Sequence, residues 1–289
     1  MSETPTRPLL RWHGGQWLLA PWIIGHFPPH RIYTEVFGGA ASVLLRKPRA
    51  YAEVWNDLDD GATTLMRVLR TGRGTELIEA LRLTPFARRE FELAYEPTTD
   101  EMEIARRLIV RSFMGFGSDG HNPKVRTGFR AAANRSGTTP AHDWANYPDA
   151  LATIADRLRG LVVEHRPAIE VLLQHDSRQT LHYVDPPYLP QTRSQKSRKG
   201  GERYHAYQHE MTVADHEALL SVLLELEGMV VLSGYPAPLY DDALAGWHRV
   251  ERAALADGAR KRTEVLWINP AAVSALPEHQ HAFDLGVAA

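Results

Sequence analysis

Five short apolar runs, each ending in acidic or turn-forming residues, constrain the fold most strongly. They are RIYTEVF (31–37), AYAEVWNDLDD (50–60), LHYVDPPY (181–188), GMVVLSGY (228–235) and TEVLWINP (263–270). Apolar runs of this length, bounded by turn chemistry, are typical of strands buried on both faces of a sheet. The first run is followed by AASVLLRK, a helix start of small residues with apolar periodicity. The sequence therefore predicts an α/β fold.

The region from 65 to 165 has a different pattern. It contains charged amphipathic segments typical of helices, TELIEALRLT, EIARRLIVRSF and PDALATIADRLRGL, interrupted by a Gly- and Arg-rich stretch at 115–137. The apolar runs resume after it. We therefore predict one α/β domain, formed by residues 1–64 and 166–289, that is split by a mainly helical insertion of residues 65–165.

Composition narrows the chemistry. The 289 residues include no cysteine, which excludes disulfides and thiolate metal sites, and none of the 14 histidines has an HExxH or comparable spacing. His205 and His209 lie in polar sequence, where we expect a solvated face. No apolar run is long enough for a membrane span and no signal peptide is evident. We expect a cytoplasmic monomer with no metal and no membrane partner.

Two cationic stretches stand out against a net charge of −2. The first contains Lys124, Arg126, Arg130 and Arg135, and the second Arg193, Lys196, Arg198, Lys199 and Arg203. Each could be a solvated loop, or a local patch that binds nucleic-acid phosphates. The second stretch lacks apolar anchors, so we expect a loop that is mobile when free and that folds over the active site when nucleic-acid phosphates neutralise its cations. The alternative is a tolerated surface loop with no role.

Two of the predicted strand ends carry residues suited to a nucleoside ligand. After the first strand, Glu35 precedes Gly38 and Gly39, where glycines let a ligand approach the backbone or simply allow tight packing. Asp57 follows the second strand, where an acid can hold ribose hydroxyls. Helix capping by Asp57 or Asp59 is the alternative.

The sequence DPPY (185–188) is the most specific feature of the chain. Its two prolines have fixed φ and no N–H, which holds the Asp185 carboxylate and the Pro186 carbonyl stiffly at a strand end. An amine with two N–H groups could donate one to each oxygen. Tyr188 could stack on the attached ring, a contact worth roughly 1–3 kcal/mol per base. A purely structural turn is the alternative.

Taken together, these motifs resemble the Dam-type N6-adenine DNA methyltransferases of the alpha arrangement, particularly phage-borne ones. The similarity extends over nearly the whole chain, through LLRWHGGQW (9–17), YTEVFGGAASVLLRK (33–47), EVWNDLD (53–59), DPPY, VLSGY (231–235) and RTEVLWINP (262–270). The resemblance implies a Rossmann-like, mostly parallel, seven-stranded methyltransferase sheet flanked by helices, in which the helical insertion is the target-recognition domain.

The resemblance also implies roles for individual residues. S-adenosylmethionine would be bordered by Arg11, Trp12, Gly14, Gly15, Glu35, Phe37, Gly38, Gly39, Asp57 and Asp185. Asp185, Pro186, Pro187 and Tyr188 would hold an adenine flipped out of duplex DNA, with hydrogen bonds that localise the lone pair of its amine toward the methyl donor. The DNA contacts would include Arg111, Lys124, Arg126 and Arg130 of the insertion, together with the second cationic stretch.

Two positions depart from the family pattern. Gln16 stands where a lysine near the catalytic acid is usual, and Val36 where a proline is usual. Three functions therefore stay open from the sequence. The first is a site-specific DNA adenine methyltransferase; the others are an amine methyltransferase acting on RNA adenine or on cytosine, and a DNA-binding homologue with impaired catalysis.

Overall fold

A computed structural model describes residues 4–132, 137–189, 192, 209–256 and 260–277. It contains one seven-stranded sheet in the order β3-β2-β1-β4-β5-β7-β6. The strands are β1 (Ile32–Glu35), β2 (Ala52–Asn56), β3 (Val162–Glu164), β4 (Thr180–Val184), β5 (Met229–Gly234), β6 (His248–Ala256) and β7 (Arg260–Ile268). Strands β1 to β5 are parallel to one another, and β7 is antiparallel to both β5 and β6. The predicted seven-stranded, mostly parallel methyltransferase-like sheet is confirmed.

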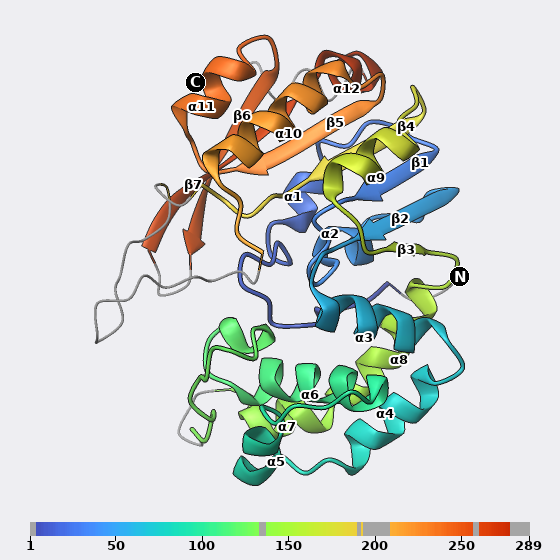
Figure 1. Ribbon diagram of the computed structural model, residues 1–289, viewed down its shortest axis with the longest axis vertical. Helices are drawn as coiled ribbons and strands as arrows, with labels where there is room; N and C mark the ends of the chain where they lie inside the picture. Colours follow the sequence, from blue (N-terminus) through green and yellow to red (C-terminus); the bar gives the residue numbers. More distant parts are fainter. Residues whose placement is uncertain (1–3, 133–136, 190–191, 193–208, 257–259, 278–289) are drawn as a thin grey trace.

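The alternation of side chains along β5 shows how the sheet is covered on both faces. Met229 and Val231 join one apolar cluster, whereas Val230 and Leu232 join the other. The second cluster is completed by α9 (Ala168–His175), α10 (Val213–Glu225) and α11 (Pro238–Ala243), which lie on one face in Figure 1. The opposite face carries α1 (Ala20–Ile24), α2 (Ser42–Arg46) and α12 (Pro270–Ala275). The central strands are therefore buried on both sides.

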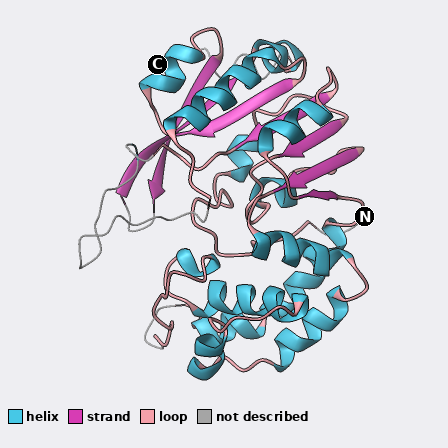
Figure 2. Cartoon of the chain, in the orientation of Figure 1, coloured by secondary structure: helices cyan, strands magenta, loops and turns pink. Residues whose placement is uncertain are grey.

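A group of helices forms a separate layer below the sheet (Figures 1 and 2). The elements are α3 (Asp60–Arg70), α4 (Gly74–Leu83), α5 (Arg88–Leu93), α6 (Glu101–Met114), η1 (Asp119–His121), α7 (Pro140–Ala145) and α8 (Tyr147–Arg157). Their apolar side chains, such as Met66 and Leu108, belong to the same cluster as Tyr33 and Trp55 of the sheet. The helical layer and the sheet therefore share one continuous core.

The sheet takes one strand from the range that the sequence assigned to the insertion. β3 lies within 65–165 but pairs with β2, from Val54↔Val162 to Asn56↔Glu164. The other proposed boundary, between residues 64 and 65, falls inside α3. Neither β3 nor β6 was expected from the residue pattern. β3 has only three residues, and β6 is an edge strand whose charged residues hide its alternation.

Candidate active site at the carboxyl edge of the sheet

The sheet order reverses between β1 and β4, which are neighbours although the whole helical layer lies between them in the sequence. In open α/β sheets, ligands bind outside the carboxyl ends of the strands at such a switch point. Glu35 is the last residue of β1, Asp57 follows β2, Asp185 follows β4, and Ser233 lies near the end of β5. The topology therefore gathers the predicted functional acids at one edge.

A cavity of about 420 Å³ lies at this edge. Its lining includes most of the predicted cofactor residues, namely Trp12, Gly14, Gly15, Glu35, Phe37, Gly38, Gly39, Asp57 and Asp185. Pro187 and Gln16 also line it. Arg11 is not one of the lining residues; its backbone N–H donates to the Ser112 hydroxyl at 2.7 Å, which ties the N-terminal segment to α6.

The glycine turn after β1 is shaped by two tryptophans. A Cβ on Gly38 would lie 2.0 Å from Nε1 of the buried Trp55, and a Cβ on Gly39 would lie 2.8 Å from Nε1 of Trp12. Gly39 also has a φ of +46°, in the left-handed region that glycine tolerates best. Close packing accounts for Gly38, and both glycines border the cavity. The packing alternative therefore applies at this turn alongside the ligand interpretation.

The two acids after β2 have different roles. Asp59 is the N-cap of α3 and accepts from the Ala62 N–H at 2.8 Å. Asp57 caps no helix; its carboxylate accepts from the backbone N–H groups of Gly39 at 2.7 Å and Asp59 at 2.8 Å. Burial raises the pKa of Asp57, and these backbone donors oppose the increase. Asp57 thus joins the glycine turn to the end of β2, beside the cavity.

Glu35 is buried at the floor of the cavity. Its Oε2 atom accepts from the Tyr33 hydroxyl at 2.7 Å and from the Leu44 N–H, near the start of α2, at 2.8 Å. Burial raises the pKa of the Glu35 carboxyl to about 8, despite these two donors. Glu35 is therefore largely protonated at neutral pH.

Asp185 is held by two side chains from distant parts of the chain. The Ser233 hydroxyl donates to its Oδ1 atom at 2.7 Å, and the Gln16 amide Nε2 donates to the same oxygen at 3.3 Å. Burial raises the pKa of Asp185 to about 6, while the bonds from Ser233 and Gln16 lower it. Gln16, which stands where a lysine is usual in the family, thus contacts the predicted catalytic acid Asp185 through a neutral amide.

The Tyr188 side chain is buried behind Asp185. Its hydroxyl donates to Oε2 of Glu264 at 3.1 Å and accepts from Nε2 of Gln16 at 2.8 Å. Its ring meets that of Tyr235 edge to face, with centroids 4.4 Å apart, and Arg262 lies over the Tyr235 ring at 4.9 Å. A second layer of polar and aromatic side chains therefore supports the DPPY segment.

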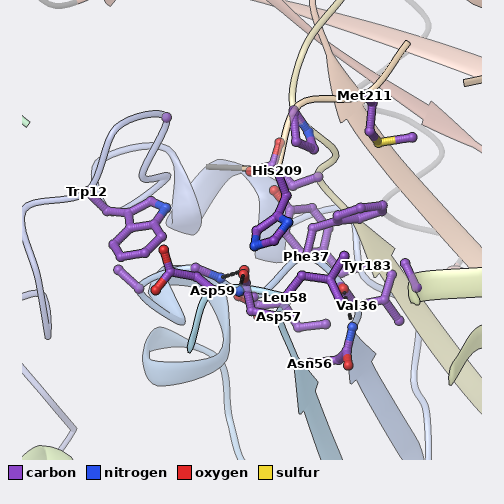
Figure 3. A pocket seen from close by; sticks show the side chains of 18 of the residues that line it. Trp12, Val36, Phe37, Asn56, Asp57, Leu58, Asp59, Tyr183, His209 and Met211 are labelled. Atoms are coloured by element: carbon purple, nitrogen blue, oxygen red, sulfur yellow. Dashed lines mark hydrogen bonds between the residues drawn. The ribbon is translucent and has the colours of Figure 1, made fainter. Parts of the chain in front are cut away.

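The sequence analysis did not predict some of the residues that the structure brings to this site. Ser233 and Glu264 lie within the quoted runs VLSGY and RTEVLWINP, but no local spacing shows that they meet residues 185 and 188. His209 is exposed, as expected of a solvated face, and it also lines the cavity, which the sequence did not predict. Figure 3 shows it pointing toward Asp57 and Asp59, whose pKa values its positive charge lowers.

The predicted DNA-contacting residues lie in two environments. Arg111 of α6 is only 8% exposed, and its guanidinium donates to the backbone carbonyls of Ala94 at 2.6 Å and Gly120 at 3.1 Å. Lys124 and Arg126 are exposed, and Arg130 is half-buried with a hydrogen bond to the Phe113 carbonyl. Arg135 and the five cations of the second stretch, Arg193, Lys196, Arg198, Lys199 and Arg203, lie outside the described residues.

The sheet order, the glycine turn, the acids at the carboxyl edge and the DPPY sequence after β4 together define an α/β methyltransferase. The family model of the D12 class N6 adenine-specific DNA methyltransferases matches residues 12–229, more than half of the chain, and the protein belongs to this family. A search of curated proteins finds no match. The chain is thus an enzyme that methylates the N6 amine of adenine in DNA, and the family implies S-adenosylmethionine as the methyl donor.

The part of the chain that the structure describes shows neither a metal-binding group nor a membrane-spanning helix. Within it, no group of three or more His, Asp or Glu side chains is placed to hold a metal ion. Across the same residues, no helix has the length and apolar character needed to cross a bilayer.

Proposed function

We propose that the cavity binds S-adenosylmethionine and that Asp185 orients the target adenine beside it. The observation that carries the proposal is the Asp185 carboxylate, fixed by Ser233 and Gln16 where β4 ends against the cavity. The bound donor supplies an electrophilic methyl group on a sulfonium. The protein's own residues therefore have to position an amine and stabilise the charge that develops on it.

The cavity has the chemistry that a nucleoside with a charged tail requires. Phe37 and Met211 supply apolar surface, Asp57 supplies an acid at the end of β2, and Gly38 and Gly39 let a ligand approach the backbone. A volume of about 420 Å³ lies within the usual range of small-molecule sites. We assign the ribose to the Asp57 side of the cavity and the methyl-bearing end to the Asp185 side.

Asp185 and Pro186 act together on the adenine amine. One amine proton is donated to the carboxylate and the other to the Pro186 carbonyl oxygen, so that the nitrogen lone pair is directed at the methyl group. The carboxylate stabilises positive charge that grows on the nitrogen only when it is ionised. Because its pKa is raised to about 6, activity should fall as pH drops through that value and the carboxylate is protonated.

Target recognition is assigned to the helical layer. Most of the helical layer, which lies below the sheet in Figure 1, comes from residues 65–165, and these residues offer Lys124, Arg126 and Arg130 to phosphates or base edges. Arg111 is left out of this set because its guanidinium is occupied by backbone carbonyls. Adenine must leave the duplex stack to reach Asp185, at a cost of a few kcal/mol that stacking on Tyr188 and the phosphate contacts offset.

The decisive experiment is transfer of labelled methyl from S-adenosylmethionine to unmethylated plasmid DNA. RNA transcribed from the same plasmid serves as the competing substrate, and nucleoside analysis of the product identifies the modified base. We expect N6-methyladenine in DNA from the wild-type enzyme and none from Asp185→Ala. Label in cytosine or in RNA alone, or equal label from both proteins, would refute the proposal.

A further inference from the structure

The hydroxyl of Tyr188 lies between two side chains that are far from it in the sequence. Glu264 accepts its proton at 3.1 Å, and Gln16 donates to its oxygen at 2.8 Å. Gln16 is 6% exposed, Glu264 8% and Tyr188 9%, so the hydrogen bonds are shielded from water. In a low-dielectric setting such bonds are stronger than they are at a surface.

The location of Glu264 explains how it reaches the active site. β7 pairs with β5 from Val231↔Ile268 to Gly234↔Val265, and Glu264 is the next residue of β7 beyond the end of β5. It therefore stands at the carboxyl edge, with Arg252 of β6 opposite it in register. Residue 264 lies outside the 12–229 match, so the family model says nothing of its role.

A buried hydroxyl needs a hydrogen-bond partner for stability alone, and one partner would be enough. The arrangement here does more than satisfy the hydroxyl. The amide of Gln16 that binds Tyr188 also donates to Asp185 at 3.3 Å, so one side chain contacts both the stacking residue and the catalytic acid. A continuous path, Glu264 to Tyr188 to Gln16 to Asp185, links the two halves of the adenine site.

Glu264 also changes charge in the neutral range. The pKa of Glu264 is raised to about 7, because burial and the negative charge of Asp185 raise it more than the Tyr188 hydrogen bond and the Arg262 charge lower it. Tyr183, whose own pKa is raised partly by Glu264, is the other titratable neighbour. A hydrogen bond to an ionised carboxylate is roughly twice as strong as one to a neutral acceptor. The hydrogen bond from the Tyr188 hydroxyl to Glu264 therefore becomes stronger as Glu264 ionises.

We propose that Glu264 and Gln16 are positioning residues that fix the Tyr188 ring and the Asp185 carboxylate in one arrangement for the target adenine. The inference rests on the proposed roles of Asp185 and Tyr188. Gln16 bridges the two, and Glu264 anchors the hydroxyl from the far side. Glutamine at position 16 leaves Glu264 and Asp185 without a shared cation, which a lysine there would supply.

A double-mutant cycle tests the contact between Glu264 and Tyr188. Glu264→Gln should lower kcat by about tenfold, because the Tyr188 hydroxyl loses a hydrogen bond to a charged acceptor; tenfold corresponds to about 1.4 kcal/mol. In a Tyr188→Phe background the same change should lower kcat less than twofold, because the hydroxyl is already gone. Glu251→Gln, on the neighbouring strand β6, is the matched control and should match the wild type. Additive losses in the cycle would overturn the inference.

The pH profile gives a readout that a purely structural role would not change. The wild-type kcat should rise through two ionisations, one near 6 from Asp185 and one near 7 from Glu264. Glu264→Gln should keep the first and lose the second. A profile identical to that of the wild type would overturn the inference.

A titration of the free enzyme separates this inference from the proposed function. Carbon-13 NMR of the labelled glutamate carboxyl groups, assigned with Glu264→Gln, should show Glu264 titrating near 7. Tyr188→Phe should raise that value, because the hydroxyl's hydrogen bond lowers it. A Glu264 carboxyl that titrates near 4.5 in both proteins would overturn the inference, even if the enzyme methylates DNA as proposed.

Discussion

Two buried glutamates on neighbouring strands, Glu35 of β1 and Glu53 of β2, have opposite electrostatic environments. Each is 3% exposed, and their strands pair in the register Tyr33↔Glu53 and Glu35↔Trp55. Glu53 forms ion pairs with Lys47 at 2.8 Å and Arg157 at 2.6 Å, and these cations hold its pKa below the usual value. Glu35 forms no ion pair with a described residue, and its pKa rises to about 8.

The opposite pKa shifts of Glu53 and Glu35 distinguish a carboxylate that stabilises the fold from one that borders the candidate active site. The Glu53 carboxylate joins β2 to α2 and α8, and its charge is compensated where it stands. Glu35 and Asp185 line the cavity, Glu264 contacts the DPPY tyrosine Tyr188, and all three have raised pKa values. Raised pKa values are typical of functional sites. Five changes would break or sharpen this contrast.

The largest effect should come from Arg157→Ala. It leaves Glu53 with one cation in a buried setting, and breaking a buried pair typically costs about 3–5 kcal/mol of unfolding free energy. Chemical denaturation would measure the loss. Methyl transfer per folded molecule should stay at the wild-type level; a large fall in that specific activity would place the cluster in the site and erase the contrast.

Asp185→Ala should have the opposite effect to Arg157→Ala, with a large loss of activity and little loss of stability. The loss of a preorganised charged group is expected to lower kcat by about 10²–10³ or more. The midpoint of denaturation should change little, because removal of the carboxylate also removes its desolvation cost. Activity within about tenfold of the wild type would contradict the assigned role.

Glu35→Gln should change the pH dependence of stability. The folded pKa of about 8 lies above the usual 4.5, so the stability contribution of Glu35 is full below pH 4.5 and is lost as pH rises through 8. Across that window the wild type should lose up to about 1.4 kcal/mol per pH unit relative to the glutamine variant. Denaturation series at pH 5, 7 and 9 would show it. Glu53→Gln is the comparison, and its difference from the wild type should stay nearly constant over this range, because the lowered pKa of Glu53 affects stability only below its usual value of 4.5.

Replacing Arg126 and Arg130 by alanine tests the same contrast for arginines, between Arg157, which stabilises the fold, and two arginines proposed to contact DNA. Unlike Arg157, Arg126 is exposed, with an ion pair to Glu96 at 3.9 Å and its guanidinium over the Tyr95 ring at 5.4 Å. We expect normal stability, weaker DNA binding, and a salt slope shallower by about 0.9 for each phosphate that the variant no longer binds. Specificity should relax only if one of the two reads a base edge. Unchanged affinity and slope would remove this segment from the interface.

The smallest effect should come from Ser233→Ala. The Ser233 hydroxyl stabilises the ionised form of Asp185, so its removal should move the acid limb of the kcat profile to higher pH, by less than about one unit. At pH 8 the variant and the wild type should differ little. A limb that stays in place would show that the serine does not tune the catalytic acid.

The sequence predicted the parts of this molecule that depend on local patterns. Runs such as GMVVLSGY became buried strands because their apolar residues serve two faces at once, and DPPY marked the end of a strand through its fixed backbone. Arg111 illustrates the limit. The sequence predicted that Arg111 is a cation available to contact DNA, but in the fold its guanidinium donates to the Ala94 and Gly120 carbonyls. Likewise, Glu264 meets Tyr188 only because β7 runs antiparallel beyond β5.

The adjacency of β1 and β4 has a consequence for how the chain folds as it is made. β1 is complete at residue 35, but its partner strand ends only at residue 184, after the whole helical layer has been synthesised. At roughly 5–20 residues per second, the apolar edge of β1 waits on the order of ten seconds for its neighbour. The helices made in that interval share the apolar cluster of Tyr33 and Trp55. We therefore expect the layer assigned to target recognition to be the first cover available to the nascent sheet.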